Sequence, residues 1–170
     1  MSLSIFSCRR SRVLASVLLC SATVSAWAWE GGRMTGGGSI ICSGPAYRVT
    51  FGYELHCQRE GTPISAPNNL EVNFSTGEHF HLTALTSAVC SGPDNGSPDA
   101  PFTTMTGTGT GTLNGDPATI SFRLVDNAEP GVGVDFASFT IRQGSTTVLQ
   151  CSNKLEGGNN QAHRTTGSKP

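Results

Sequence analysis

Three histidines and one glutamate are the side chains of this sequence best suited to bind a metal ion. His79 and His81 are two residues apart, so a β-strand would place both imidazoles on the same face. His56 and Glu71 lie on two further segments that alternate polar and apolar residues. Imidazole and carboxylate groups together suit a divalent ion such as zinc or copper. If the segments are neighbouring strands, the four side chains could converge on a metal, although a solvent-facing strand carries polar residues without any metal.

The remaining acidic side chains lack the spacing of a known catalytic or calcium-binding motif. Asp126, Glu129 and Asp135 flank a Gly/Pro-rich turn but do not fit the carboxylate spacing of an EF-hand. Glu54 and Glu71 could form the carboxylate pair of a glycosidase, yet nothing in the sequence indicates a cleft. The sequence also contains no Gly-x-Ser-x-Gly elbow. We therefore expect a non-catalytic protein rather than an enzyme, with no cofactor unless a divalent metal binds the histidines.

The histidines and Glu71 belong to three segments with the period of two that is typical of half-buried strands. Residues 70–75 and 79–84 alternate polar and apolar side chains, with a tight turn at Thr76-Gly77 between them. Residues 48–57 alternate in the same way, and their apolar face consists of Val49, Phe51, Tyr53, Leu55 and Cys57. These segments predict an antiparallel meander with one apolar and one polar face.

An unusual run of alternating threonine and glycine occupies residues 106–112. A strand face lined by glycine permits the close approach of another backbone or of an aromatic ring, for which Phe122 and Phe136 are candidates. The alternative is that the run marks a tight corner or a bulge.

Further alternating segments follow this run, and no part of the sequence has a sustained helical period. About eight strands joined by polar turns indicate an all-β fold, namely an antiparallel β-sandwich or a small barrel. We expect the domain to span residues 39–156. A glycine-rich lead-in at 29–38 precedes it, and a polar tail at 157–170 follows.

The first 28 residues predict a cleavable export signal. Arg9, Arg10 and Arg12 form a basic region, and residues 13–24 form an apolar run that is too short to span a bilayer. Ala26-Trp27-Ala28 supplies the small-x-small pattern that signal peptidase accepts. The Arg9-Arg10 pair leaves open whether general secretion or the twin-arginine route is used. We expect a bacterial protein that is secreted or periplasmic.

The charge balance of the processed chain excludes several classes of partner. Removal of the signal takes three of the 11 basic residues and none of the 12 acidic ones, which leaves a formal charge of −4. A mildly acidic protein has no basic surface with which to neutralise phosphates, so we expect no nucleic-acid binding. No later apolar run is long enough for a membrane span. The expected partner is an unidentified extracellular or envelope ligand.

Four cysteines remain after processing: Cys42, Cys57, Cys90 and Cys151. An even number of cysteines in an oxidising compartment predicts two disulfides. No pair has the C-x-x-C spacing of zinc and thiol-redox motifs. Three pairings are compatible with the sequence.

Seven short motifs stand out between residues 31 and 163: GRMTGGGS, GYELHC, NNLEV, FHLTALTSAVC, TGTGTGTLNGDPATISF, DNAEPG and GNNQAH. Together they resemble a family of small secreted bacterial domains of unassigned function, which occur alone or appended to larger cell-surface proteins. The resemblance covers nearly the whole mature chain. It implies an exported β-rich module and implies no activity.

The resemblance also implies a disulfide pairing. The family pattern includes cysteines at the positions of Cys57 and Cys90, whereas it more often has apolar or small residues at those of Cys42 and Cys151. Two additional cysteines that pair with each other give Cys57–Cys90 and Cys42–Cys151, which would place the first and last strands side by side. The family more often has histidine where this chain has Asn160, which weakens a metal site in the closing GNNQAH motif.

These observations favour a secreted, disulfide-stabilised, non-catalytic module that binds an extracellular ligand or a surface. The alternative is a metal-binding protein or metal-assisted enzyme that uses His56, His79 and His81, with Glu71, on a polar sheet face. The two hypotheses differ in whether these side chains meet in the folded chain.

Overall fold

The computed structural model describes residues 31–43, 47–58, 64, 66–93, 100 and 102–164, and it is all-β. The predicted export signal and the last six residues of the polar tail lie outside the described residues. Nine strands follow one another: β1 (Gly32–Ile41), β2 (Arg48–His56), β3 (Asn69–Phe74), β4 (His79–Ser91), β5 (Thr104–Leu113), β6 (Asp116–Val125), β7 (Phe136–Gln143), β8 (Thr146–Lys154) and β9 (Gly157–Arg164). No helix occurs in the described part, which confirms the predicted fold class.

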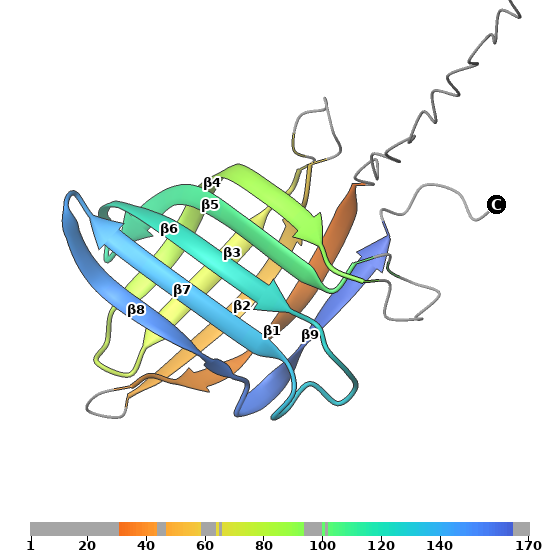
Figure 1. Ribbon diagram of the computed structural model, residues 1–170. Coiled ribbons are helices and arrows are strands. Elements are labelled where there is room, and N and C mark those ends of the chain that lie inside the picture. The colour runs from red at the N-terminus through yellow and green to blue at the C-terminus, as the bar shows by residue number, and fades with distance from the viewer. Residues whose placement is uncertain are drawn as a thin grey trace, which may run out of the picture.

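All nine strands belong to one continuous antiparallel sheet in the order β8-β7-β6-β5-β4-β3-β2-β1-β9. The sheet curls, so that β5 to β8 cross over β1 to β3 and β9 (Figure 1). Apolar side chains from the two halves meet inside the curl, where the rings of Phe51 on β2 and Phe139 on β7 have centroids 5.0 Å apart. The prediction of a sandwich or small barrel is thus met by a single curled sheet that encloses its own core.

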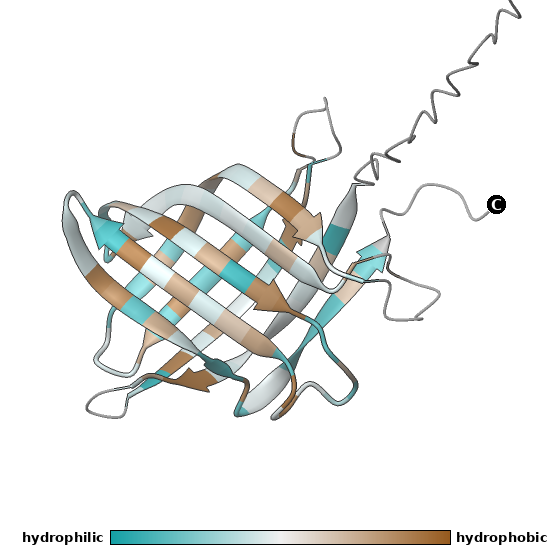
Figure 2. Cartoon of the chain, in the orientation of Figure 1, coloured by the Kyte–Doolittle hydropathy of each residue, from teal (hydrophilic) through white to brown (hydrophobic). Residues whose placement is uncertain are grey.

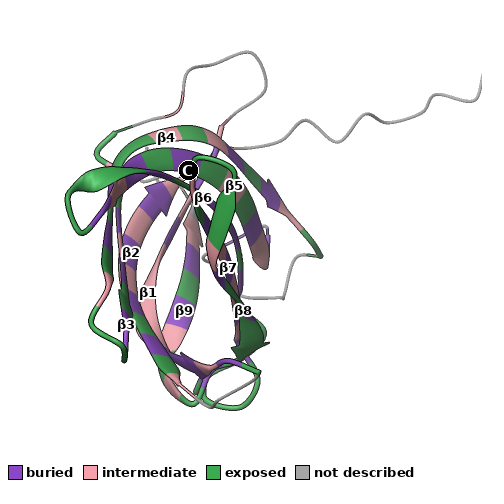
Figure 3. Ribbon diagram, turned by 90° about the vertical axis from the view of Figure 1, so that its left-hand side faces the viewer, coloured by how far each residue is buried: buried purple, intermediate pink, exposed green. Residues whose placement is uncertain are grey.

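The alternation seen in the sequence determines which side chains enter this core. Buried and exposed residues alternate along most strands (Figure 3), as do apolar and polar residues (Figure 2). The largest fully buried side chains are Phe80, Phe139, Met34, Ile40, Leu55, Leu70, Met105, Ile120, Leu124, Ile141, Leu149 and Leu155. Burial of this apolar surface is the main stabilising contribution to the fold.

The threonine–glycine run packs against one of the two candidate rings, Phe122, and it lies beside bulges of the neighbouring strand β4. Gly107 on β5 faces the interior, and a Cβ atom there would overlap the Phe122 ring of β6 and the carbonyl oxygen of Ser87 on β4. Glycine therefore lets the aromatic ring lie directly against the backbone. The neighbouring strand β4 also has register shifts at Leu82/Ala84 and Leu85/Ser87, which are β-bulges beside the same run.

Two of the predicted domain boundaries are wrong. The glycine-rich lead-in forms most of β1, and the polar tail contains β9, which pairs with β1 from Gly32↔Arg164 to Ser39↔Gly157. These strands have no apolar alternation, because backbone packing replaces side-chain packing between them. A Cβ atom at Gly36 or Gly38 would overlap the β9 backbone. The folded domain therefore runs from Gly32 to Arg164 instead of 39–156.

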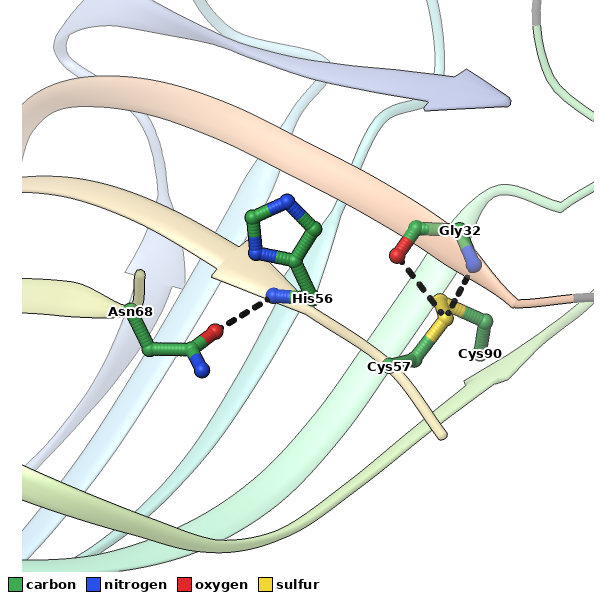
Figure 4. Close-up of a disulfide and its surroundings, with 5 residues drawn as sticks. All are labelled: Gly32, His56, Cys57, Asn68 and Cys90. Atoms are coloured by element: carbon green, nitrogen blue, oxygen red, sulfur yellow. Dashed lines mark hydrogen bonds between the residues drawn. A yellow bond between two sulfur atoms is a disulfide. The ribbon is translucent and has the colours of Figure 1, made fainter. Parts of the chain in front are cut away.

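The disulfides pair as the family resemblance implied: Cys42 with Cys151 and Cys57 with Cys90, at Cα separations of 5.1 and 5.7 Å. The first joins the residue after β1 to β8, so β1 is bonded to the edge of the opposite half of the sheet. The second joins the residue after β2 to β4. Gly32 at the start of β1 lies against it and donates its N–H to Cys57 Sγ at 3.1 Å (Figure 4).

Candidate functional site

Glu71 on β3 contacts both histidines of β4 on the outer, polar face of the sheet. The cross-strand pairs are Glu71↔His81 and Asn73↔His79. One carboxylate oxygen of Glu71 is hydrogen-bonded to Nδ1 of His81, and the other lies 2.9 Å from Nε2 of His79. His79 Nδ1 is also hydrogen-bonded to Asn73 Oδ1. The structure therefore brings together three of the four predicted metal ligands.

His56 lies apart from this group. It is the last residue of β2, beyond the final β2–β3 pair at Glu54↔Asn69, whereas Glu71 pairs with Gly52. Its cross-strand neighbour on β1 is Arg33, and its backbone N–H donates to Asn68 Oδ1 at 2.7 Å (Figure 4). The offset of four residues along β2 corresponds to about 13 Å, which separates His56 from the other three side chains.

The His79–Glu71–His81 group has the form of a surface hydrogen-bonded cluster. Both imidazoles are about half exposed, and the carboxylate between them already accepts or faces a ring nitrogen on each oxygen. In the described ranges, no group of three or more His, Cys, Asp or Glu side chains has an arrangement that could hold a metal ion. Exposed pairs of this kind contribute little to stability.

Hydroxyl groups make up most of the adjoining outer surface of β4 to β7, which also carries the exposed side chains of Arg123 and Arg142. Cross-strand pairs align Ser87, Thr108, Ser121 and Thr140 in one row over four strands. We name this surface the hydroxyl face, and its outward side chains are Thr83, Thr86, Ser87, Thr106, Thr108, Thr110, Thr119, Ser121, Ser138 and Thr140. Thr108 Oγ1 lies 2.8 Å from both Thr86 Oγ1 and Ser87 Oγ, so the hydroxyls at one end of the row are mutually oriented.

Two buried aspartates bind the open edge of β9, a role that the sequence analysis missed. Asp126 follows β6 directly and accepts the backbone N–H of Ala162 at 2.9 Å. Asp135 precedes β7 directly and accepts the backbone N–H of Asn160 at 2.8 Å. Because β9 pairs with β1 on its other side, the two carboxylates take the place of a further strand. We refer to Asp126, Asp135 and these two amides as the β9 closure.

The side chain of Asn160 lies inside the curled sheet, fully buried, and joins β9 to three other strands. Its amide nitrogen donates to the carbonyl oxygens of Val125 at 2.9 Å and Phe136 at 3.1 Å, and its oxygen accepts the Tyr53 hydroxyl at 2.8 Å. Burial, reinforced by the charges of Asp135 and Asp126, holds the pKa of Tyr53 well above its usual range. Asparagine at this position therefore has a structural function that explains its place in the closing motif.

One signal in the sequence could have indicated the β9 closure. Asp126 and Asp135 stand at the two ends of one loop, each directly beside an apolar strand, so antiparallel pairing of the two strands places the two carboxylates close together. The strand that these two carboxylates bind lies in the segment that the sequence analysis expects to be a polar tail.

Comparison of the chain with known protein families, with curated proteins and with solved structures finds no match. The described residues contain no helix that is long and apolar enough to cross a membrane. Two disulfides are typical of proteins that fold outside the cytosol.

Proposed function

We propose that this protein is an exported, non-catalytic binding module that uses the hydroxyl face to contact an uncharged, hydrogen-bonding ligand of the cell envelope or its surroundings. The observation that carries the proposal is the row of Ser87, Thr108, Ser121 and Thr140 across four strands. Hydroxyls both donate and accept hydrogen bonds, and they cost little to desolvate compared with charges. Such a row suits a neutral polymer with repeated polar groups, such as a polysaccharide.

The use of the carboxylates elsewhere in the domain supports a binding role. Asp126 and Asp135 are buried and accept backbone N–H groups. Glu54 lies 3.2 Å from the Arg33 guanidinium, and Glu71 faces two imidazoles. Each of these four carboxylates has a partner that accounts for it without a substrate. The predicted export and the proposed membership of the secreted domain family agree with an extracellular or periplasmic place of action.

Co-sedimentation with insoluble envelope fractions and with insoluble polysaccharides tests the proposal. Thr108→Lys and Thr140→Lys place a charge on the hydroxyl face, and each should reduce sedimentation of the processed protein at least severalfold. Gln161→Lys adds the same charge on an exposed outward position of β9 and should leave sedimentation unchanged. Equal loss in all three variants, or no loss in any, would contradict a hydroxyl-face binding site. So would turnover of a glycosidic or ester substrate that Glu71→Gln abolishes.

Divalent-metal binding, the second function expected from the sequence, is disfavoured, because His79, His81 and Glu71 meet on one face without an arrangement among the described residues that could hold a metal ion. A metal would have to displace the contacts that now join the carboxylate to the rings. Elemental analysis of untagged protein decides the matter: a stoichiometric metal that is lost in the His79→Ala/His81→Ala variant and kept in His56→Ala supports it. Metal-free, folded protein after incubation with zinc or copper rejects it.

A further inference from the structure

The two carboxylates of the β9 closure differ in how well the protein satisfies their charge. Asp135 is fully buried and accepts N–H groups from Asn160 at 2.8 Å and Asn127 at 2.8 Å, with Ala128 at 3.5 Å. Asp126 is 6% exposed and, among the described residues, accepts the N–H of Ala162. A buried carboxylate that accepts several N–H groups is stabilised as an anion, whereas one with a single N–H partner is less so. Asp126 is therefore the member of the pair that is suited to carry a proton.

The charged and titratable groups that face Asp126 come from three elements. Asp135 and Glu129 lie on the same β6–β7 loop, His163 lies on β9, and the Tyr53 hydroxyl approaches from β2. Asp135 and Glu129 repel an ionised Asp126, whereas His163 attracts it. Glu129 is itself attached to β9, because its Oε1 accepts the side-chain N–H of Asn159 at 2.8 Å. The attachment of β9 therefore brings negative charges together.

We propose that the β9 closure is a proton-dependent device, which holds β9 most firmly when Asp126 is protonated and loosens as Asp126 ionises. A protonated carboxyl keeps an oxygen that accepts the Ala162 N–H, so the proton removes the repulsion without removing the hydrogen bond. Loosening frees the N–H groups of Asn160 and Ala162 on a strand edge, where a strand of a partner could pair. The inference concerns the β9 edge and stands apart from binding at the hydroxyl face.

The direction of the pH dependence follows from linkage. Burial raises the pKa of Asp126 above its ordinary value, with further raising by the charges of Asp135 and Glu129, while the Ala162 N–H and His163 oppose the shift. Because the attached state binds the proton more tightly than the detached state, the attached state is favoured at low pH. The attachment weakens as pH rises from the ordinary carboxylate value through the raised pKa of Asp126.

Hydrogen exchange of the processed, disulfide-bonded protein measures this attachment residue by residue. The protection factors of the Asn160 and Ala162 amides, corrected for the intrinsic pH dependence of exchange, should fall as pH rises. The fall should be at most about tenfold per pH unit over the interval between the ordinary and the raised pKa of Asp126. The amide of Phe122, inside the β5–β6–β7 ladder, serves as an internal control and should keep its protection.

Two isosteric variants separate this device from general pH effects. Asp126→Asn cannot ionise, so protection of the two amides should no longer depend on pH. Glu129→Gln removes one repelling charge while keeping the oxygen that Asn159 bonds, so the loosening should end at a lower pH and be smaller in total than in the wild-type protein. Protection that stays constant or rises with pH in the wild-type protein would overturn the proposal. An unchanged pH profile in Glu129→Gln would overturn it as well. The Glu129→Gln variant keeps the test decisive if Asp126→Asn does not fold.

Discussion

The Tyr53 hydroxyl donates a hydrogen bond to Asn160 Oδ1 at 2.8 Å, inside the sheet and across 107 residues of sequence. The bond joins β2 to the edge strand β9 with β1 between them. Asn160 also bonds the ends of β6 and β7. A single buried amide therefore connects strands from the two halves of the curled sheet.

Removal of the Asn160 side chain should destabilise the fold strongly. Asn160→Ala leaves the Tyr53 hydroxyl and two backbone carbonyls buried without their partner, for which we expect a loss of about 3 kcal/mol in the free energy of unfolding. Tyr53→Phe removes one donor and should cost about 1 to 2 kcal/mol. Urea denaturation measures both changes. In the double variant the two losses should not add, because both remove the same bond; additive losses would mean that the bond contributes nothing.

The two disulfides should contribute unequally to stability. They span 109 and 33 residues of sequence, and the chain-entropy relation gives about 5 kcal/mol for the longer loop and about 4 kcal/mol for the shorter. Cys42→Ala/Cys151→Ala should therefore lower the urea midpoint more than Cys57→Ala/Cys90→Ala. The reverse order would indicate that contacts of the Cys57–Cys90 pair with β1 outweigh loop entropy.

Glycines of the curled sheet should respond to alanine according to the space around them. Gly107→Ala must displace the Phe122 ring or the β4 backbone, so we expect the free energy of unfolding to fall by about 1 to 3 kcal/mol. Gly52→Ala meets no atom within 4 Å and restricts the unfolded chain, so it should be neutral or stabilising by up to about 1 kcal/mol. Thermal melts of the two variants provide the comparison. Equal changes in stability would mean that the close packing around Gly107 is not the reason why glycine is required at this position.

Alkaline pH should destabilise the protein through Tyr53. Burial raises the pKa of this phenol, so the folded state holds the phenolic proton more tightly than the unfolded state does. The resulting stability is complete below the ordinary tyrosine pKa of about 10 and is lost as pH rises above it. Stability measured between pH 8 and 11 should fall more steeply in the wild-type protein than in Tyr53→Phe. Identical slopes would show that Tyr53 titrates as an ordinary exposed phenol.

The strands that the sequence predicted most accurately are those whose apolar side chains form the core. In β2, β3 and β4, alternation of residues such as Val49, Phe51 and Leu70 with polar neighbours leaves one arrangement that buries them, and the structure has it. The glycine-rich part of β1 and the whole of β9 were missed, because Gly36, Gly38 and Gly158 bring backbone against backbone. Alternation with a period of two reflects the burial of side chains, so it cannot detect strands that pack through their backbone.

The candidate site was predicted in part for a related reason. His79 and His81 share a face because of strand geometry, and a tight turn after β3 places Glu71 opposite them. The position of His56 depended on the register between β2 and β3, because alternation excludes a slip of one residue but not a slip of two. The hydrogen bonds of Asp126 and Asp135 are made to β9, so they cannot be predicted from a sequence interpretation in which that segment is a tail.

Gly32 and Arg164 face each other as cross-strand partners at the ends of β1 and β9, about 5 Å apart by the geometry of antiparallel pairs. The polypeptide thus enters and leaves the folded unit side by side. Such a unit can be inserted into a surface loop of a host protein without stretching that loop, or carried on one flexible tether, with the same internal structure in either setting.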